Sequence, residues 1–499
     1  MPYENEYSKH KSISDIINSK KVKTFMSDMK VITRSKANFE KVDESIFIDD
    51  VETLKKEERL KYVFAFDGSK TQIALETGFP GAEIGIIKVS QTFIQLELMK
   101  KYESEAFPHP SEYDEIFLTQ NFEVTIPGFN VCSELYGDPK DFFRFSLYNH
   151  LKNNHNTFID ILNEKSGLDL KPETFLETYI DILKKKPEAI SCIHPCEYCR
   201  TNDRSGEPLL SFDDFFVDNV ETQDIDFVHE IKCGCKHNPK DIFITDLLHF
   251  HEGFSSSGSN DGLYNQIMSF FEKIIFMNLI HNIKDFFPSH DNNGEKIDNP
   301  VFRDCAFILD GPLAIYNYAS WFATGMADEL ISMGEDNILV VGVEKTGHFV
   351  DHFKNLNGIE SPEDKPLKPG MLFFLGDNYI KRYVKYSTSP IPYGKNVYFG
   401  KKLFYKSHEN QLFVINLAYN SFEDREIYLN SRNTKHYELS QPRLRDIAWL
   451  LEKYSSSRYA NALSFVSMAH ENASISSNYF SKRVIDDFVK DSMSKDAGE

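Results

Sequence analysis

Short apolar runs recur along this chain and predict buried strands. Residues 61–67 (KYVFAFD) and 305–313 (CAFILDGPL) share one pattern, an apolar run followed by Asp and then Gly. Apolar runs of this length, bounded by turn residues, are typical of strands that are buried on both faces. We therefore predict a strand in each segment, the first ending at Gly68 in a tight turn.

Three further segments have strand character. Residues 81–98 (GAEIGIIKVSQTFIQLEL) are rich in β-branched side chains and predict one or two strands. Residues 337–346 (NILVVGVEKT) predict another apolar strand, and residues 396–419 predict a β-hairpin.

A helical period marks other parts of the chain. Residues 261–283 carry apolar side chains at helical spacing over a wide face, which predicts a largely buried helix. These apolar positions are Ile267, Phe270, Phe271, Ile274, Ile275 and Leu279. Helices are also predicted in residues 148–162, 172–186 and 464–475.

The order of these elements predicts an α/β fold with a mixed sheet flanked by helices. Residues 61–110 and 240–485 would form its core. Residues 1–60 are polar and helical in pattern and would form an N-terminal extension. Residues 111–239 would form an insertion with helices and a Cys-rich module, and residues 486–499 a polar tail.

The charge balance narrows the classes of function. The 499 residues carry a net charge of −20, whereas a protein that coats DNA is normally basic. Any nucleic-acid surface would therefore be a local basic patch. The candidates are Lys381–Arg382, Lys401–Lys402, Arg443 and Arg445.

The distribution of apolar and charged residues does not indicate a membrane protein. No run of 18 or more uncharged apolar residues occurs, so we expect no transmembrane helix. The first residues, MPYENEYSKHKSISD, are polar and lack the pattern of a secretory signal. We therefore expect a cytoplasmic protein.

The cysteines point to a metal rather than to disulfides. Five of the 7 Cys residues are clustered, at Cys192, Cys196, Cys199, Cys233 and Cys235. The last four form two knuckles, C196-x2-C199 and C233-x-C235, which match a closed tetrahedral Zn²⁺ site. The second knuckle is tighter than usual, so other ligands stay open, namely Cys192, His194, His229 and His237. Free thiols are the remaining alternative.

The two Asp-Gly sequences carry the candidate chemistry. If their strands are neighbours, Asp67 and Asp310 project side by side at the carboxyl ends, where α/β sheets gather ligands. Carboxylates this close raise each other's pKa, and a bound Mg²⁺ or Mn²⁺ relieves that repulsion. Two such ions can promote phosphodiester cleavage. The alternative is that each Asp-Gly is simply a turn.

Two other residues are candidates for the same centre. Glu272 lies within the apolar helix and is either a third metal ligand or a Glu that reaches water or pairs near Lys273. His470, before Glu471, is either a metal ligand or proton donor, or a structural His. Ser69 would brace the turn after Asp67.

Several common catalytic motifs do not occur. The chain has no G-x-x-x-x-G-K-[ST] loop for ATP phosphates, no G-x-S-x-G and no H-E-x-x-H. If ATP drives the reaction, a partner supplies the ATPase.

The order of motifs resembles that of the NurA nuclease family. The matching stretches are FAFDGS (64–69), the helix with central Glu272 (263–281), FILDGPL (307–313), LVVGVEKT (339–346), NVYFGKKLF (396–404) and ANALSFVSMAHENASIS (460–476). The Cys-rich insertion and the long segment between the two Asp-Gly motifs depart from the family pattern.

This resemblance implies an RNase H-like core and a Mn²⁺- or Mg²⁺-dependent nuclease that acts on DNA ends and single strands. Asp67, Asp310, Glu272 and His470 would then be the metal-binding and catalytic residues. The resemblance further implies a homodimer that works with a hexameric HerA-type ATPase, in DNA end processing or in defence against phage.

Two other functions stay open. The chain would otherwise be a non-catalytic, zinc-containing adaptor that binds nucleic acid or an ATPase ring. The other possibility is an RNase or a transposase-like strand transferase on the same fold. Contacts to the 2′-OH would decide between RNA and DNA as substrate.

Overall fold

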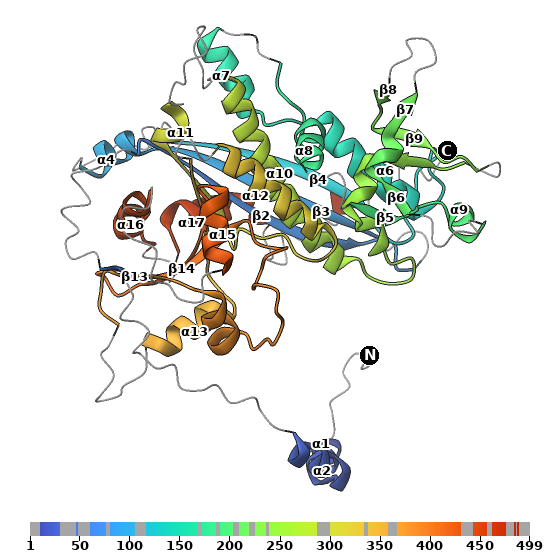
Figure 1. The fold of residues 1–499 in the computed structure, drawn as a ribbon. Helices are drawn as coiled ribbons and strands as arrows, with labels where there is room; N and C mark the ends of the chain where they lie inside the picture. Colours follow the sequence, from blue (N-terminus) through green and yellow to red (C-terminus); the bar gives the residue numbers. More distant parts are fainter. Residues whose placement is uncertain are drawn as a thin grey trace.

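The computed structural model shows a mixed α/β protein in which helices flank one large sheet (Figure 1). It describes residues 10–29, 46–47, 60–75, 80–104, 116–167, 169, 171–185, 190–202, 209–218, 225–235, 239–286, 300–333, 338–357, 367–430, 443–456, 462–475, 484–485 and 487–488. The predicted fold class is confirmed at this level.

Among the described residues, nine strands form the central sheet, in the order β1-β13-β14-β15-β12-β11-β2-β3-β4. Their bounds are β1 Ile46–Phe47, β2 Tyr62–Ala74, β3 Glu83–Gln95, β4 Phe117–Pro127, β11 Cys305–Asp310, β12 Leu339–Glu344, β13 Met371–Phe374, β14 Gly400–Lys406 and β15 Leu412–Ala418. Strands β2, β11 and β12 are parallel, and all other pairs are antiparallel. The predicted hairpin is β14–β15.

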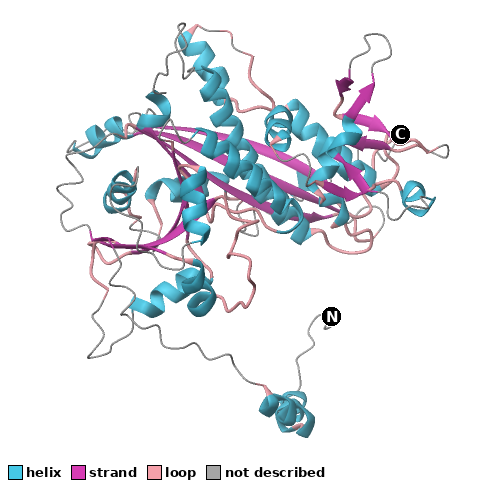
Figure 2. Cartoon of the chain, in the orientation of Figure 1, coloured by secondary structure: helices cyan, strands magenta, loops and turns pink. Residues whose placement is uncertain are grey.

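Helices cover the sheet on either side of its strands (Figure 2). Their bounds are α1 His10–Asn18, α2 Lys20–Asp28, α4 Leu96–Ser104, α6 Pro139–Asn153, α7 Phe158–Ser166, α8 Phe175–Lys184, α9 Glu197–Asn202, α10 Asp261–Phe286, α11 Pro300–Asp304, α12 Ser320–Met333, α13 His348–Asn357, α14 Asp377–Tyr379, α15 Phe422–Asn430, α16 Leu444–Lys453 and α17 Ser464–Ala473. No described helix is long and apolar enough to cross a membrane.

Helix α10 is buried on all sides because it lies between two layers. One side packs on β2 and β3, and the other packs on α8 (Figure 1). Phe270, Phe271 and Phe276 are all 0% exposed. Burying a side chain of this kind contributes about 1.5–3 kcal/mol, so tertiary packing stabilises this helix.

The first predicted strand is longer than expected. Residues 61–67 were expected to end in a turn at Gly68, but β2 runs on to Ala74 and Gly68 lies in its middle. The polar residues after Gly68 stay extended because β3 pairs with β2 along its whole length, from Tyr62↔Gln95 to Ala74↔Glu83. The turn prediction was therefore wrong.

Other boundaries also moved. The stretch 81–98 forms a single strand, β3, and then enters α4. Residues 148–162 fall on two helices, α6 and α7, with a break between them. Residues 1–60 contain α1 and α2 as expected, but also β1, which pairs with β13 at the sheet edge. Residues 51–59 and most of the tail lie outside the described residues.

The stretch 111–239, expected as an insertion, holds one strand, then the helices α6, α7 and α8, and then a Cys-rich last part. Its first element, β4, pairs with β3 and belongs to the central sheet. Its last part holds short strands in two-stranded sheets together with α9. These strands are β5 Ser191–Ile193, β6 Leu209–Ser211, β7 Phe216–Asp218, β8 Ile225–Phe227 and β9 Glu230–Lys232, which pairs with β10 Asp241–Phe243.

Candidate metal centre

Asp67 and Asp310 meet on neighbouring strands. Strands β2 and β11 are parallel, and their last paired residues, Phe66 and Leu309, directly precede the two aspartates. One ligand atom each of Asp67, Asp310 and His470 lies within 4.8 Å of the others. The structure therefore brings together three of the four predicted residues, from chain positions up to 403 apart.

His470 reaches this point from α17. Its Nδ1 lies 2.7 Å from Oδ2 of Asp67, and its side chain is 48% exposed against 6% for Asp67. With Nδ1 held by Asp67, Nε2 is the ring nitrogen left for a ligand.

Ser69 fixes the end of α17 rather than a turn in β2. Its hydroxyl donates to the carbonyl oxygen of Ala473 and accepts from the backbone N–H of Ile475, at 3.2 Å. Ser69 and Asp67 lie on the same side of β2, because side chains alternate along a strand. The strand thus holds both the helix and its histidine.

Gly68 explains how Glu272 comes close. Gly68 faces the opposite side of β2 from Asp67, toward α10. A Cβ at Gly68 would lie 2.6 Å from Oε1 of Glu272 and 3.1 Å from Cγ of Met268. Glycine is therefore needed here for close approach of the helix, not for a turn.

Glu272 sits beside the three clustered residues but outside their 4.8 Å group. It is 7% exposed, and its Oε2 accepts from Nζ of Lys273 at 2.6 Å. The pairing with Lys273 is the structural alternative that the sequence left open. A role as third metal ligand stays a prediction.

Burial and mutual repulsion raise the pKa of these carboxyl groups. The pKa of Asp67 rises from 3.8 to about 8, first because the group is buried and then because Asp310 and Glu272 are negative. Lys345 and the Gly68 N–H, which donates to Oδ1 of Asp67 at 2.8 Å, act in the opposite direction. Burial also raises the pKa of Glu272, as does the charge of Asp310.

Lys345 is a residue of this centre that the sequence did not single out. Its Nζ lies 2.9 Å from Oδ2 of Asp310, and both side chains are part-exposed, at 24% and 19%. The available signal was its place directly after the strand β12, at the same sheet edge as Asp310.

The donor set fits a hard divalent cation. Two carboxylates and one imidazole converge, with one carboxylate buried and holding its proton more tightly than usual. Carboxylate oxygens are the ligands that Mg²⁺ and Mn²⁺ prefer, and imidazole nitrogen is tolerated by Mn²⁺. A cation at this point would offset the repulsion that raises the pKa of Asp67.

The four predicted zinc ligands also converge. The Sγ atoms of Cys196, Cys199, Cys233 and Cys235 all lie within 4.8 Å of one another. Sγ of Cys235 lies 3.7 Å from that of Cys196 and 3.2 Å from that of Cys233. Tetrahedral Zn²⁺ with bonds of about 2.3 Å needs sulfur atoms roughly 3.8 Å apart, so the arrangement fits this ion.

The alternative zinc ligands are engaged elsewhere or not described. Cys192 groups with His251 and Glu252. Nδ1 of His194 accepts from the backbone N–H of Cys196 at 3.1 Å, and Nδ1 of His229 lies against the hydroxyl of Tyr148. His237 lies outside the described residues.

Solved structures that resemble this chain include NurA nucleases. They include a structure titled as the NurA nuclease from Sulfolobus solfataricus, 9% identical, with 98% of each chain covered and a TM-score of 0.29. A structure titled as NurA bound to dAMP and manganese is 10% identical, with 94% of each chain covered and a TM-score of 0.24. TM-scores this low do not establish a shared fold. No family model and no curated protein matches the sequence.

Half of the predicted basic residues are buried, namely Lys401, Lys402 and Arg443. Lys401 and Lys402 are 0% and 2% exposed and pair with Asp424 and Glu344. Arg443 donates to the carbonyl oxygens of Arg303 and Cys305. The prediction of a DNA-facing surface was wrong for these three residues, because their side chains are buried and bonded within the fold. Arg382 and Arg445 are exposed.

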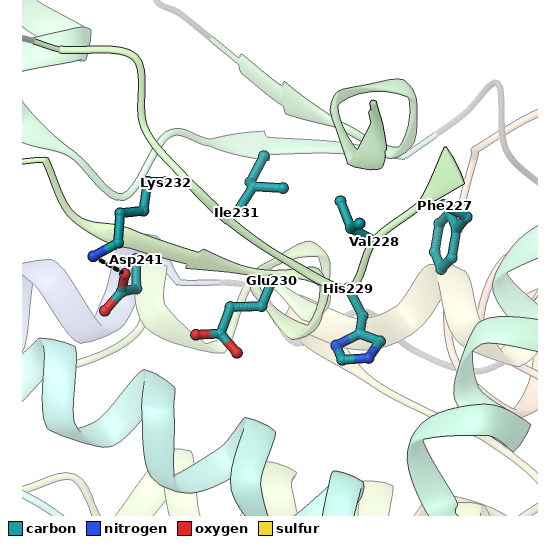
Figure 3. A pocket seen from close by; sticks show the side chains of 7 residues that line it. All are labelled: Phe227, Val228, His229, Glu230, Ile231, Lys232 and Asp241. Carbon is teal, nitrogen blue, oxygen red and sulfur yellow. Dashed lines mark ion pairs between the residues drawn. The ribbon is translucent and has the colours of Figure 1, made fainter. Parts of the chain in front are cut away.

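A pocket lies on the strands β9 and β10 and the residues just before β9 (Figure 3). Its lining residues are Phe227, Val228, His229, Glu230, Ile231, Lys232 and Asp241, and Lys232 pairs with Asp241 at 3.0 Å. No member of the Asp67 group lines it, so this pocket is separate from the candidate metal centre.

Proposed function

We propose that this chain is a divalent-metal-dependent nuclease that hydrolyses phosphodiester bonds in DNA, at ends and in single strands. The observation that carries this proposal is the convergence of Asp67, Asp310 and His470 from three distant segments, with Asp67 buried. A buried carboxylate beside a second carboxylate serves no packing purpose, and once ionised it destabilises the fold unless a cation offsets its charge.

Each residue has a distinct part in this proposal. Asp67 and Asp310 would hold the cation, which would polarise the phosphate and favour ionisation of the attacking water. His470, oriented by Asp67, exchanges a proton at Nε2 with the phosphodiester or its leaving oxygen. Lys345 pairs with Asp310, and in this proposal its ammonium group would donate to a phosphate oxygen. Glu272 is a third carboxylate at the same centre.

The strand order supports an RNase H-like core. Strands β4, β3 and β2 are antiparallel, and the parallel pair β11 and β12 continues the sheet on the other side of β2. We therefore keep the proposed division into extension, core, insertion and tail, with β4 assigned to the core.

Cleavage assays with matched variants test the activity. Single- and double-stranded DNA would be incubated with Mn²⁺ and with wild type, Asp67→Ala or Asp310→Ala. We expect each variant to lose at least about 100-fold in rate, since both residues hold the cation. Glu123→Ala removes an exposed carboxylate of β4 and serves as the control, with unchanged rate expected.

Equal cleavage by all four proteins would refute the assignment. The adaptor alternative predicts DNA binding without any Mn²⁺-dependent cleavage. An RNA substrate of the same sequence separates a DNase from an RNase, because an RNase would prefer it.

We also propose that Cys196, Cys199, Cys233 and Cys235 bind a structural Zn²⁺. The ion would tie α9 to the β9–β10 hairpin, which small two-stranded elements need because they have little core of their own. Purified wild type is expected to contain about one zinc per chain, and Cys233→Ser to lose most of it. Cys132→Ser changes an exposed free cysteine and should keep the zinc. Equal zinc contents in all three proteins would contradict this site.

The remaining parts of the proposal concern partners. The nuclease would act in the cytoplasm as a homodimer with a hexameric HerA-type ATPase, in DNA end processing or phage defence. The absence of an ATP-binding loop in the sequence supports a separate ATPase. Stimulation of cleavage by ATP and such an ATPase, and the mass of the complex in solution, test these statements.

A further inference from the structure

Two exposed tyrosines follow the strand that carries Asp310. Tyr316 and Tyr318 are 44% and 36% exposed, on either side of Asn317. Asn317 has a φ of 60°, and the short helix η6, Asn317–Ala319, begins there. Large aromatic side chains left in water beside a functional centre are typical of a binding surface.

The backbone that carries Tyr316 is fixed by a second segment. Ala314 pairs with Tyr398 in an antiparallel bridge. The N–H of Ile315 donates to the carbonyl oxygen of Val397 at 3.0 Å, and that of Phe399 to Leu313 at 2.9 Å. The loop after Asp310 is therefore clamped rather than free.

The ring of Tyr316 is fixed as well. Its hydroxyl lies 2.9 Å from that of Tyr398, and the two rings meet edge to face at 6.0 Å. Tyr398 is itself held by Nζ of the buried Lys402, 4.4 Å from its ring centre. A ring held in this way loses little conformational entropy when a ligand stacks on it.

Tyr318 is held from a different direction. Its ring lies against Gly253, where a Cβ would come within 2.4 Å of it. Its backbone N–H points to Oε1 of Gln266 on α10, at 3.5 Å. One side of the ring is thus covered by backbone while part of it stays exposed.

Both tyrosines are held by elements that also carry residues of the candidate metal centre. Their segment starts at Asp310, and the N–H of Gly311 donates to the carbonyl oxygen of Val343 at 2.8 Å, next to the end of β12. Gln266 precedes Glu272 by six residues on α10, which is about 9 Å along the helix axis. Nucleotides stack about 3.4 Å apart along a strand, so this span covers two or three of them.

We propose that Tyr316 and Tyr318 form a stacking platform for unpaired bases of single-stranded DNA, next to the phosphate held at Asp67 and Asp310. This inference rests on the proposed function. Base stacking on aromatic rings tolerates any sequence, because every base has a π face. Bases in a closed duplex are already stacked on each other and cannot use the rings. The platform therefore favours single strands and frayed ends over closed duplex.

Lys395 supplies a positive charge on the clamping segment. It is exposed, on the turn between Tyr393 and Tyr398. A lysine beside a stacking ring can neutralise the backbone phosphate of the stacked nucleotide. The aromatic side chains thus suit the base of a nucleotide, and the lysine suits its phosphate.

Kinetics with conservative replacements test the platform. Tyr316→Leu and Tyr318→Leu keep the apolar bulk and remove the ring, whereas Tyr318→Trp keeps a ring. We expect each Leu variant to raise the KM for a single-stranded oligonucleotide about 10-fold with kcat unchanged, and Tyr318→Trp to retain the wild-type KM. Phe422→Leu removes another exposed aromatic side chain, on α15, and is the control without effect.

Abasic substrates identify stacking directly. A single-stranded oligonucleotide that lacks the two or three bases beside the cleaved phosphate should bind wild type about 10-fold more weakly. The same lesion should have little further effect on the Leu variants, because the ring that it would contact is already gone. Leu variants with the wild-type KM, or equal losses from the lesion in wild type and variants, would overturn the platform.

Binding measurements in the Asp310→Ala background separate the two proposals. If wild type does not cleave DNA but binding still depends on the two rings, the nuclease proposal fails and the platform stands. If cleavage needs Asp67 and Asp310 but is indifferent to the rings, the platform fails and the nuclease proposal stands.

Discussion

At the scale of single residues, Asp67 occupies a position that lowers the stability of the fold. It is 4% exposed and lies beside two other carboxyl groups, and its pKa rises from 3.8 to about 8. A buried carboxyl group that prefers its proton weakens the fold once it is ionised. Such a residue is retained for a purpose other than folding.

Replacing Asp67 by Asn should therefore stabilise the metal-free protein at high pH. Because the folded pKa exceeds the unfolded pKa, the contribution of Asp67 to the free energy of unfolding is complete below pH 3.8 and is lost as the pH rises through about 8. In chelator at pH 9, Asp67→Asn should be more stable than wild type by roughly 1–3 kcal/mol.

Thermal or urea unfolding at pH 5 and pH 9 measures this difference. The two proteins should differ less at pH 5, and added Mn²⁺ should stabilise wild type more than the variant. A variant that is less stable than wild type at pH 9 would show that ionised Asp67 does not destabilise the fold.

Local sequence patterns could not predict the burial or the ion-pair partners of Lys345, Lys401 and Lys402. Each is a lysine near a strand, yet Lys345 lies by Asp310 while Lys401 and Lys402 are enclosed with Asp424 and Glu344. The partners are 23 to 58 residues away. Pairing over such separations depends on strand order, which local patterns do not contain.

At the scale of elements, β2 organises the centre because it has helices on both faces. Asp67 and Ser69 meet α17, whereas Gly68 meets α10. Apolar runs were enough to predict β2, β11 and β12, and helical spacing was enough to predict α10 and α17. The length of β2 was not predictable, because its polar second half is extended only through pairing with β3.

Ser69→Ala should reduce cleavage without unfolding the protein. The substitution removes both hydrogen bonds that hold the end of α17, so His470 would be placed less well. We expect a fall of about 10-fold in kcat with the melting temperature changed by only a few degrees.

Ser467→Ala, which removes a hydroxyl on the same helix, is the matched comparison and should keep the wild-type kcat. If both variants behave alike, the contact between Ser69 and α17 has no role in placing His470.

At the scale of the whole molecule, the Cys-rich module shares its core with the sheet. Cys192, Cys196 and Cys233 belong to the same hydrophobic cluster as Phe64 and Phe307. A module that is continuous with the main core does not unfold by itself. Neither the spacing of the cysteines nor their number could predict this continuity.

Loss of one of the four clustered cysteines proposed to bind zinc should therefore lower the melting temperature of the main unfolding transition. Cys233→Ser is expected to shift the melting temperature of the whole chain down by about 5 °C or more, whereas Cys132→Ser should leave it unchanged. Calorimetry measures this, and a separate early transition with an unaltered main one would show an independent module.

The contact between Asp67 and His470 also has a consequence during protein synthesis. The aspartate is translated 403 residues before the histidine that it binds. Until the residues of α17 have been translated, the nascent chain contains Asp67 and Asp310 but lacks the imidazole of His470. Translation itself thus delays assembly of the cluster of Asp67, Asp310 and His470 until the rest of the sheet has been made.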